Sequence, residues 1–130
     1  MSAREQPVLR ATRLRVLLVE DESMVALLLE DMLTELHHEV VGPVARLDKA
    51  LEIAQWQALD VALLDVNLNG EEIYPVAEAL AVREIPFVFV TGYGKGALRA
   101  PYCDRPTLEK PFRGDDLREL LAAVCRAKQD

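Results

Sequence analysis

The sequence predicts an α/β domain: a doubly wound, five-stranded parallel sheet with the flavodoxin-like strand order 2-1-3-4-5 and helices on both faces. Two observations lead to this fold class. Short apolar runs alternate five times with segments in which apolar residues recur every three or four positions, and no internal repeat interrupts them. Several of the runs also stop abruptly at polar residues. Alternating strands and helices imply right-handed crossovers, and therefore parallel strands.

The first strand is expected at residues 15–19, an apolar and partly β-branched run. It ends in three consecutive acidic residues, 20–22. Apolar residues then follow at helical spacing to about His37, with Ser23 as the expected N-cap. The first cycle therefore predicts a buried strand that leads through an acidic turn into an amphipathic helix.

The second and third cycles repeat this order. A weaker strand at residues 40–44 precedes a helix at residues 47–54, and a fully apolar strand at residues 61–64 stops at Asp65. A third helix is expected over residues 74–83. Acidic residues therefore follow both the first and the third strand, and this shared position at the strand ends is more informative than the identity of each residue.

The last two cycles are less regular. Residues 87–90 are apolar on both faces, as in a central parallel strand, and end at Thr91. Gly96 and Pro101 leave room for only a short or irregular fourth helix. Residues 107–110 form the last expected strand, and a final amphipathic helix follows it.

Length and composition fit one globular domain. The chain has 130 residues, of which 51% are hydrophobic and 28% charged, close to globular averages. The net charge of −7 disfavours direct binding to nucleic acid or to an anionic membrane, and the apolar runs are far shorter than the roughly 18 residues of a membrane span. Cys103 and Cys125 lack the C-x-x-C spacing, which favours a cytoplasmic location.

The domain is expected at residues 14–127, between a flexible leader at residues 1–13 and a tail at residues 128–130. The leader holds several arginines but no apolar stretch of the kind that secretory signals contain. The tail is too short for an output module. The sequence therefore predicts a stand-alone domain.

Polar residues follow the strands at the points where they end. Because the carboxyl ends of parallel strands meet at one edge of a sheet, we expect the polar residues that follow the strands to lie together: Glu20, Asp21 and with them Glu22, then Asp65, Asn67, Thr91 and Lys110. Three carboxylates in one crevice repel each other, and Mg²⁺ is the natural counter-ion for such a set. A carboxylate can accept a phosphoryl group, and Asp65, which follows the middle strand, is the expected nucleophile. The Lys110 ammonium and the Thr91 hydroxyl are suited to hold phosphoryl oxygens.

These residues resemble, in order and spacing, the motif of the receiver domains of bacterial two-component response regulators: the acid pair Glu20-Asp21, then Asp65, then Thr91, then Lys110-Pro111. The resemblance covers residues 14–127. It implies that Asp65 takes a phosphoryl group from a histidine kinase or a phosphotransfer protein. It also implies that Glu20, Asp21, Asp65 and the backbone carbonyl of Asn67 bind Mg²⁺, and that Thr91 and Lys110 contact the phosphoryl group.

Residues 86–94, with residues 65–70 upstream, further resemble the FAT GUY subfamily of receivers, which is often found in general stress signalling. The chain departs from the common receiver pattern at Thr107, where many receivers carry an aromatic switch residue. Tyr93 is the expected replacement, so Thr91 and Tyr93 form the expected switch. Residues 92–105 contain three glycines and a proline, and we expect them to be poorly held and to carry the signal to an output surface on the fourth helix, fifth strand and fifth helix.

The expected function is that of a stand-alone phosphoacceptor, not an enzyme beyond its own phosphorylation and dephosphorylation. It would act through a downstream protein or by relaying phosphate, as a monomer or a phosphorylation-dependent dimer. Three alternatives stay open. In the first, the chain is an interaction module that works without phosphorylation. In the second, it binds a nucleotide or a flavin, although the acidic turn at residues 20–22 would repel the phosphate of such a ligand. In the third, it is an aspartate-based phosphatase, although Asn67 occupies the position at which that chemistry needs an acid.

Overall fold

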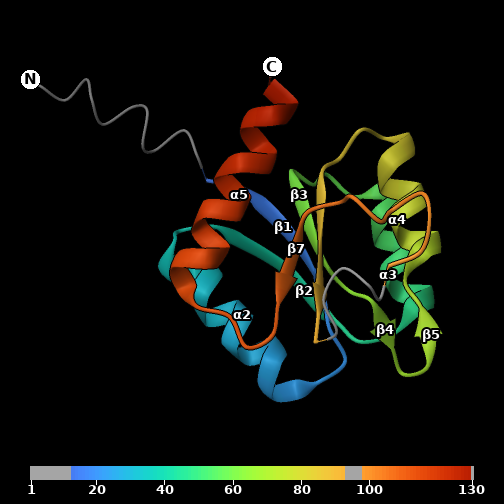
Figure 1. Cartoon of the computed structure of the whole chain (residues 1–130), viewed down its shortest axis with the longest axis horizontal. Coiled ribbons are helices and arrows are strands. Elements are labelled where there is room, and N and C mark those ends of the chain that lie inside the picture. Colours follow the sequence, from blue (N-terminus) through green and yellow to red (C-terminus); the bar gives the residue numbers. More distant parts are fainter. Residues whose placement is uncertain (1–12, 93–97, 130) are drawn as a thin grey trace, which may run out of the picture.

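The computed structural model describes residues 13–92 and 98–129. Its centre is a five-stranded parallel sheet (Figure 1), whose strands lie in the order β2-β1-β3-β6-β7. Counted along the chain within this sheet, that is the predicted order 2-1-3-4-5, and the fold class is confirmed. The strands are β1 (Arg15–Val19), β2 (Glu39–Val44), β3 (Val61–Asp65), β6 (Phe87–Thr91) and β7 (Thr107–Glu109).

Two helices cover each face of the sheet (Figure 1). They are α2 (Ser23–Glu35) and α5 (Gly114–Gln129) on one face, and α3 (Leu47–Trp56) and α4 (Tyr74–Val82) on the other. The last helix, α5, reaches two residues into the segment expected as a tail. No helix in the described part of the chain is long and apolar enough to cross a membrane.

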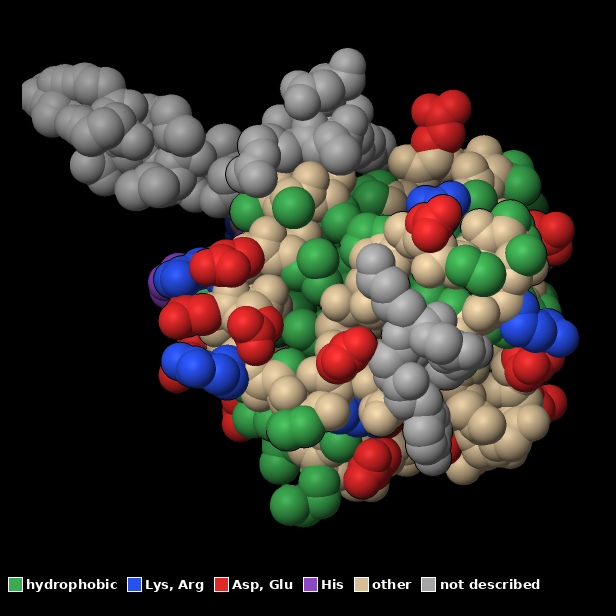
Figure 2. All heavy atoms as spheres, viewed as in Figure 1, with side chains coloured by type: hydrophobic (Ala, Val, Ile, Leu, Met, Phe, Trp, Pro, Cys, Tyr) green, Lys and Arg blue, Asp and Glu red, His purple; other side chains and the backbone are tan. Residues whose placement is uncertain are grey.

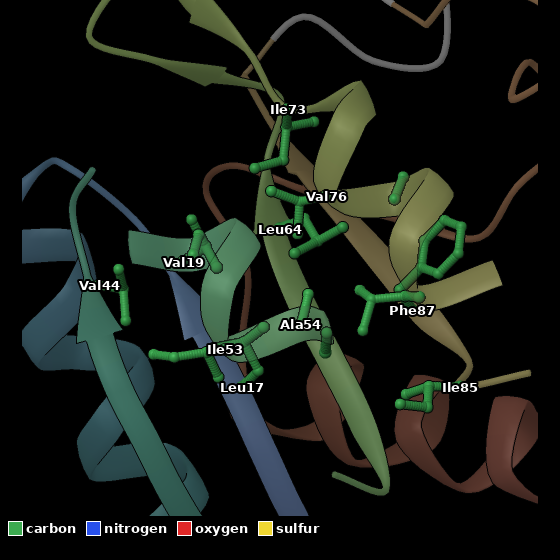
Figure 3. Close-up of a cluster of buried hydrophobic side chains, with 14 of the residues drawn as sticks. Leu17, Val19, Val44, Ile53, Ala54, Leu64, Ile73, Val76, Ile85 and Phe87 are labelled. Atoms are coloured by element: carbon green, nitrogen blue, oxygen red, sulfur yellow. The ribbon is translucent and has the colours of Figure 1, made fainter. Parts of the chain in front are cut away.

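Alternation along the strands divides the core into two clusters. In β1, for example, Leu17 and Val19 pack toward α3 and α4 (Figure 3), whereas Val16 and Leu18 pack toward α2 and α5. Successive side chains of a strand point to opposite faces, so a strand that is apolar at every position serves both clusters. This double burial holds the strand ends, and hence the polar residues that follow them, at one edge of the sheet.

The start of α2 differs from the prediction. Ser23 is the first helical residue, and Glu22 is the N-cap, with an extended backbone and no capping bond from its side chain. The Glu22 N–H donates to Oε2 of Glu20 at 3.2 Å, and the Ala26 N–H donates to the Glu22 carbonyl at 2.9 Å. The prediction of Ser23 as N-cap is wrong because these two bonds begin the helix one residue earlier.

No helix forms in residues 98–106, where the prediction allowed a short or irregular one; residues 93–97 lie outside the described residues. Successive turns take its place, since the Tyr102 N–H donates to the Arg99 carbonyl and the Arg105 N–H to the Tyr102 carbonyl. Pro101 and Pro106 each lack an N–H and disfavour helical backbone in the preceding residue. Within residues 98–106, the expected output surface therefore has no helical part.

Aromatic contacts hold this turn segment, although poorly held backbone was expected there. The Tyr102 ring stacks on that of Tyr74, with centroids 5.3 Å apart and an interplanar angle of 7°. The Arg99 guanidinium lies 4.8 Å from the centroid of the Tyr74 ring and 2.7 Å from a carboxylate oxygen of Glu72. The segment after β6 is thus tied to the segment after β3.

A small hairpin that was not predicted follows β3. It pairs β4 (Asn67–Leu68) with β5 (Glu71–Glu72) in antiparallel fashion. Its two turn residues, Asn69 and Gly70, have φ angles of 54° and 86°, as a type I′ turn requires. The Asn69 N–H donates to Oδ2 of Asp21 at 2.8 Å, so the hairpin also orients an acidic side chain from the neighbouring strand end.

Candidate functional site

Three carboxylates meet at the carboxyl ends of the adjacent strands β1 and β3. Glu20, Asp21 and Asp65 each offer one oxygen, and these oxygens all lie within 4.8 Å of one another. Glu20 and Asp65 are buried, and Asp21 is half-buried. The parallel register pairs Val19 with Leu64, which places the acids that follow the two strands side by side.

Lys110 reaches this acidic cluster from the end of β7. Its N–H donates to the Thr91 carbonyl at 2.9 Å, and its Nζ lies 3.6 Å from Oε2 of Glu20. Thr91 ends β6 and is buried. Four separate strands therefore bring the predicted acids, threonine and lysine to one edge.

Glu22 is a further contact of Lys110 that no motif assigned. Its Oε1 lies 3.7 Å from the Lys110 Nζ. The run of three acids after β1 was the only signal in the sequence, and that run does not say which of the three turns toward the lysine.

Asn67 lies beside Asp65, and its N–H donates to Oδ1 of Asp65 at 3.3 Å. Its side chain is turned to the hairpin, where Oδ1 accepts a hydrogen bond from the Gly70 N–H. Tyr93, the other expected switch residue, lies outside the described residues. Thr107 begins β7 and pairs with Phe89 of β6.

The crowding of carboxylates shifts the protonation of Asp65. Its pKa rises from 3.8 to about 8, first through burial and then through the neighbouring carboxyls of Glu20 and Asp21, while the Lys110 ammonium acts in the opposite direction. Like charges in a desolvated cleft favour the neutral form of one member. Without a cation, burial and the neighbouring carboxyls therefore favour the neutral form of Asp65.

A hard divalent cation fits this donor set. Among the described residues, Glu20 Oε1 is buried and has no hydrogen-bond partner, and a buried carboxylate oxygen left in that condition is costly. Mg²⁺ prefers oxygen ligands and takes one or two carboxylates together with water. A divalent cation held by Glu20, Asp21 and Asp65 would satisfy the orphaned oxygen and offset two of the three negative charges.

Fold and site together define a signalling domain of the receiver class, with an acidic cluster, a lysine and a threonine at the carboxyl ends of a parallel sheet. Residues 16–122 match the family described as the response regulator receiver domain, and the chain belongs to that family. The family is a signalling family of two-component systems, and its members typically bind Mg²⁺ in an acidic pocket and interact with kinases or downstream partners.

The chain is similar to the solution structure of SdrG from Sphingomonas melonis Fr1, with 45% identity and a TM-score of 0.78 over 86% of this chain and 96% of that one. A structure of the BeF3-activated conformation of SdrG from Pseudomonas melonis Fr1 shows 46% identity and a TM-score of 0.73, over 85% and 95% of the two chains. The transcriptional regulatory protein PdtaR of Mycobacterium tuberculosis is 31% identical over 120 residues, which are 88% of this chain and 58% of PdtaR.

The chain thus spans little more than half of that curated relative. Membership of the receiver family does not support the flavin-binding and phosphatase alternatives. Assignment to the FAT GUY subfamily stays a prediction from the sequence.

Proposed function

We propose that the protein is a phosphoacceptor receiver that takes a phosphoryl group on Asp65 from a histidine kinase or a phosphotransfer protein. It would then signal through phosphorylation-dependent protein contacts or pass the phosphoryl group on. The observation that carries this proposal is the meeting of a buried aspartate, two further acids and the Lys110 ammonium at one sheet edge. A purely structural ion pair would not require three converging carboxylates, which destabilise each other.

The proposed reaction is an in-line phosphoryl transfer. An Asp65 carboxylate oxygen forms a bond to phosphorus while the bond from phosphorus to the donor's imidazole nitrogen breaks. The other nitrogen of the phosphorylated imidazole carries a proton, so the ring takes the electron pair of the broken bond and leaves as neutral histidine. Lys110 and Thr91 bind the oxygens of the transferred group. Mg²⁺, when bound by Glu20, Asp21, Asp65 and the Asn67 carbonyl, supplies positive charge that keeps Asp65 ionised and offsets the charge of the phosphoryl oxygens.

The product would change the charge of the site. A phosphoryl group adds about −1.5 to −2 charges, and we expect the Lys110 ammonium, after β7, and the Thr91 hydroxyl, at the end of β6, to bind its oxygens. Reversal of a two-state equilibrium from 1:99 to 99:1 takes about 5.5 kcal/mol, which a few charge-assisted hydrogen bonds approach. We infer that Thr91 and Tyr93 form the switch, and that β7 and α5 present its outcome to a partner.

The donor would dock beside the acidic cluster. Met24, Leu27 and Leu28 are exposed large apolar side chains on the first turns of α2, directly after the acids of β1. Figure 2 shows hydrophobic side chains gathered in this region, at the lower edge of the view. A donor histidine has to come within bonding distance of Asp65, so an apolar surface next to that residue suits the protein that carries the histidine.

Intact-protein mass spectrometry tests the proposal. The protein is incubated with Mg²⁺ and acetyl phosphate, beside the variant Asp65→Ala and the control Asp104→Ala, which removes an exposed carboxylate. We expect a gain of one phosphoryl group in the parent and the control, and none in Asp65→Ala. Absence of the gain in all three would refute the proposal and favour an interaction module that works without phosphorylation.

A further inference from the structure

Lys110 has two carboxylate partners of different character. The Glu20 side chain is completely buried, whereas that of Glu22 is 62% exposed. The Lys110 side chain lies between them and is itself 24% exposed. Glu20 belongs to the acidic cluster that fits a cation, but Glu22 has no part in that cluster.

We propose that Glu22 is a positioning residue that restrains Lys110 in the unphosphorylated protein and so slows phosphorylation of Asp65; this inference rests on the phosphoacceptor function proposed above. The Lys110 Nζ lies 3.6 Å from an oxygen of Glu20 and 3.7 Å from an oxygen of Glu22, so both charges hold it in place, and a shift of the ammonium toward a phosphoryl oxygen weakens one of these ion pairs. The contact with Glu22 is the one available, because Glu20 stays in the cleft as part of the acidic cluster. Glu22 thus competes with the incoming phosphoryl group for Lys110.

Both ends of this ion pair start from fixed backbone. The Glu22 N–H donates to Glu20 Oε2 and its carbonyl accepts a bond from Ala26, which together hold it at the N-terminus of α2. The Lys110 N–H donates to the Thr91 carbonyl at the end of β6. Oε1 of Glu22 stands 3.7 Å from Nζ, so a side chain one methylene shorter, about 1.5 Å, cannot make the contact from the same backbone position.

The effect of Glu22 is expected to be modest. Exposed ion pairs are weak and are screened by salt, so this contact slows the reaction without preventing it. We expect its removal to raise the maximal phosphorylation rate about two- to fivefold at low ionic strength, the range that such pairs support. At about 1 M salt, where the screening length falls to about 3 Å, parent and variant are expected to react at the same rate.

The experiment measures the initial rate of phosphorylation against acetyl phosphate concentration in the presence of Mg²⁺. It compares the parent with Glu22→Gln, which removes the charge, and Glu22→Asp, which keeps the charge but shortens the side chain. Glu35→Gln is the matched control, because it removes an exposed charge from the far end of the same helix. Since the Glu22 side chain makes no capping bond, neither substitution at this position removes a helix cap.

We expect both Glu22 variants to show the higher maximal rate with an unchanged half-saturating donor concentration, and Glu35→Gln to behave as the parent. If Glu22→Asp matches the parent while Glu22→Gln alters the half-saturating concentration, Glu22 only repels the anionic donor and the inference is wrong. If the parent is phosphorylated and all variants react at the rate of the parent, the inference about Glu22 fails while the phosphoacceptor function stands. Absence of phosphorylation in the parent itself overturns both.

Discussion

Replacement of Asp65 by asparagine is expected to stabilise the cation-free protein, and to do so increasingly as the pH rises. The pKa of Asp65 is 3.8 in the ordinary state and about 8 in the folded protein, mainly because of burial. Between these two values the folded state holds a proton that the unfolded state has released. The free energy of unfolding of the parent therefore falls as the pH rises through this range, whereas a neutral asparagine has no such dependence.

The magnitude follows from the size of the shift. At about 1.36 kcal/mol per pKa unit, the shift of the Asp65 pKa from 3.8 to about 8 corresponds to about 6 kcal/mol in the free energy of unfolding. Asp21, the neighbouring carboxylate, is only half-buried, and solvent screening reduces this figure to roughly half. The stability difference between Asp65→Asn and the parent is then expected to widen by about 2 kcal/mol from pH 5 to pH 8, or roughly 5–10 °C in Tm.

Chemical denaturation at a series of pH values in the presence of a chelator measures this difference. Asp104→Asn serves as the control, because it removes an exposed carboxylate and is expected to follow the parent at every pH. Saturating Mg²⁺ is expected to stabilise the parent more than Asp65→Asn, since the variant has lost one anionic ligand. A difference that stays constant or narrows as the pH rises would refute the reasoning about the crowded carboxylates.

Three further predictions concern the scaffold. Nδ1 of His38 accepts a hydrogen bond from the Leu14 N–H, and burial and His37 lower the pKa of the His38 imidazole. The free energy of unfolding of the parent is therefore expected to fall as the pH drops below about 6.5. Denaturation at a series of pH values is expected to show that His38→Asn loses part of this dependence. Gly42 has φ +113°, and a Cβ there would lie 2.8 Å from the Leu18 carbonyl oxygen. Gly42→Ala is therefore expected to lower the free energy of unfolding by about 1–3 kcal/mol. The control Gly114→Ala, at a position with open space around it, should leave Tm unchanged or higher. Arg99→Leu breaks the contacts with Glu72 and Tyr74 and is expected to cost about 0.5–1.5 kcal/mol by urea denaturation; an unchanged midpoint would show that these contacts do not hold the turn segment.

Thr107 shows which features of the switch region the sequence predicts and which it does not. Its place in the motif showed that the common aromatic residue is missing. Only the folded chain shows that Tyr102 stacks on Tyr74 and packs against Phe89, the residue that pairs with Thr107, because these contacts join segments that are remote in sequence.

The sequence by itself determined the alternation of strands and helices, the two-sided core and the residues that collect at the sheet edge, whereas the strand order was implied by the resemblance to receiver domains. This was possible because apolar periodicity is a local property, and because parallel strands bring their carboxyl ends together whatever their loops do. The tertiary structure alone decided that Glu22 occupies the N-cap position of α2 and pairs with Lys110, and that turns replace the fourth helix in residues 98–106. It also decided that burial and neighbouring carboxyls raise the pKa of Asp65. These features depend on distances and burial between side chains from different strands, and such distances exist only once the sheet has formed.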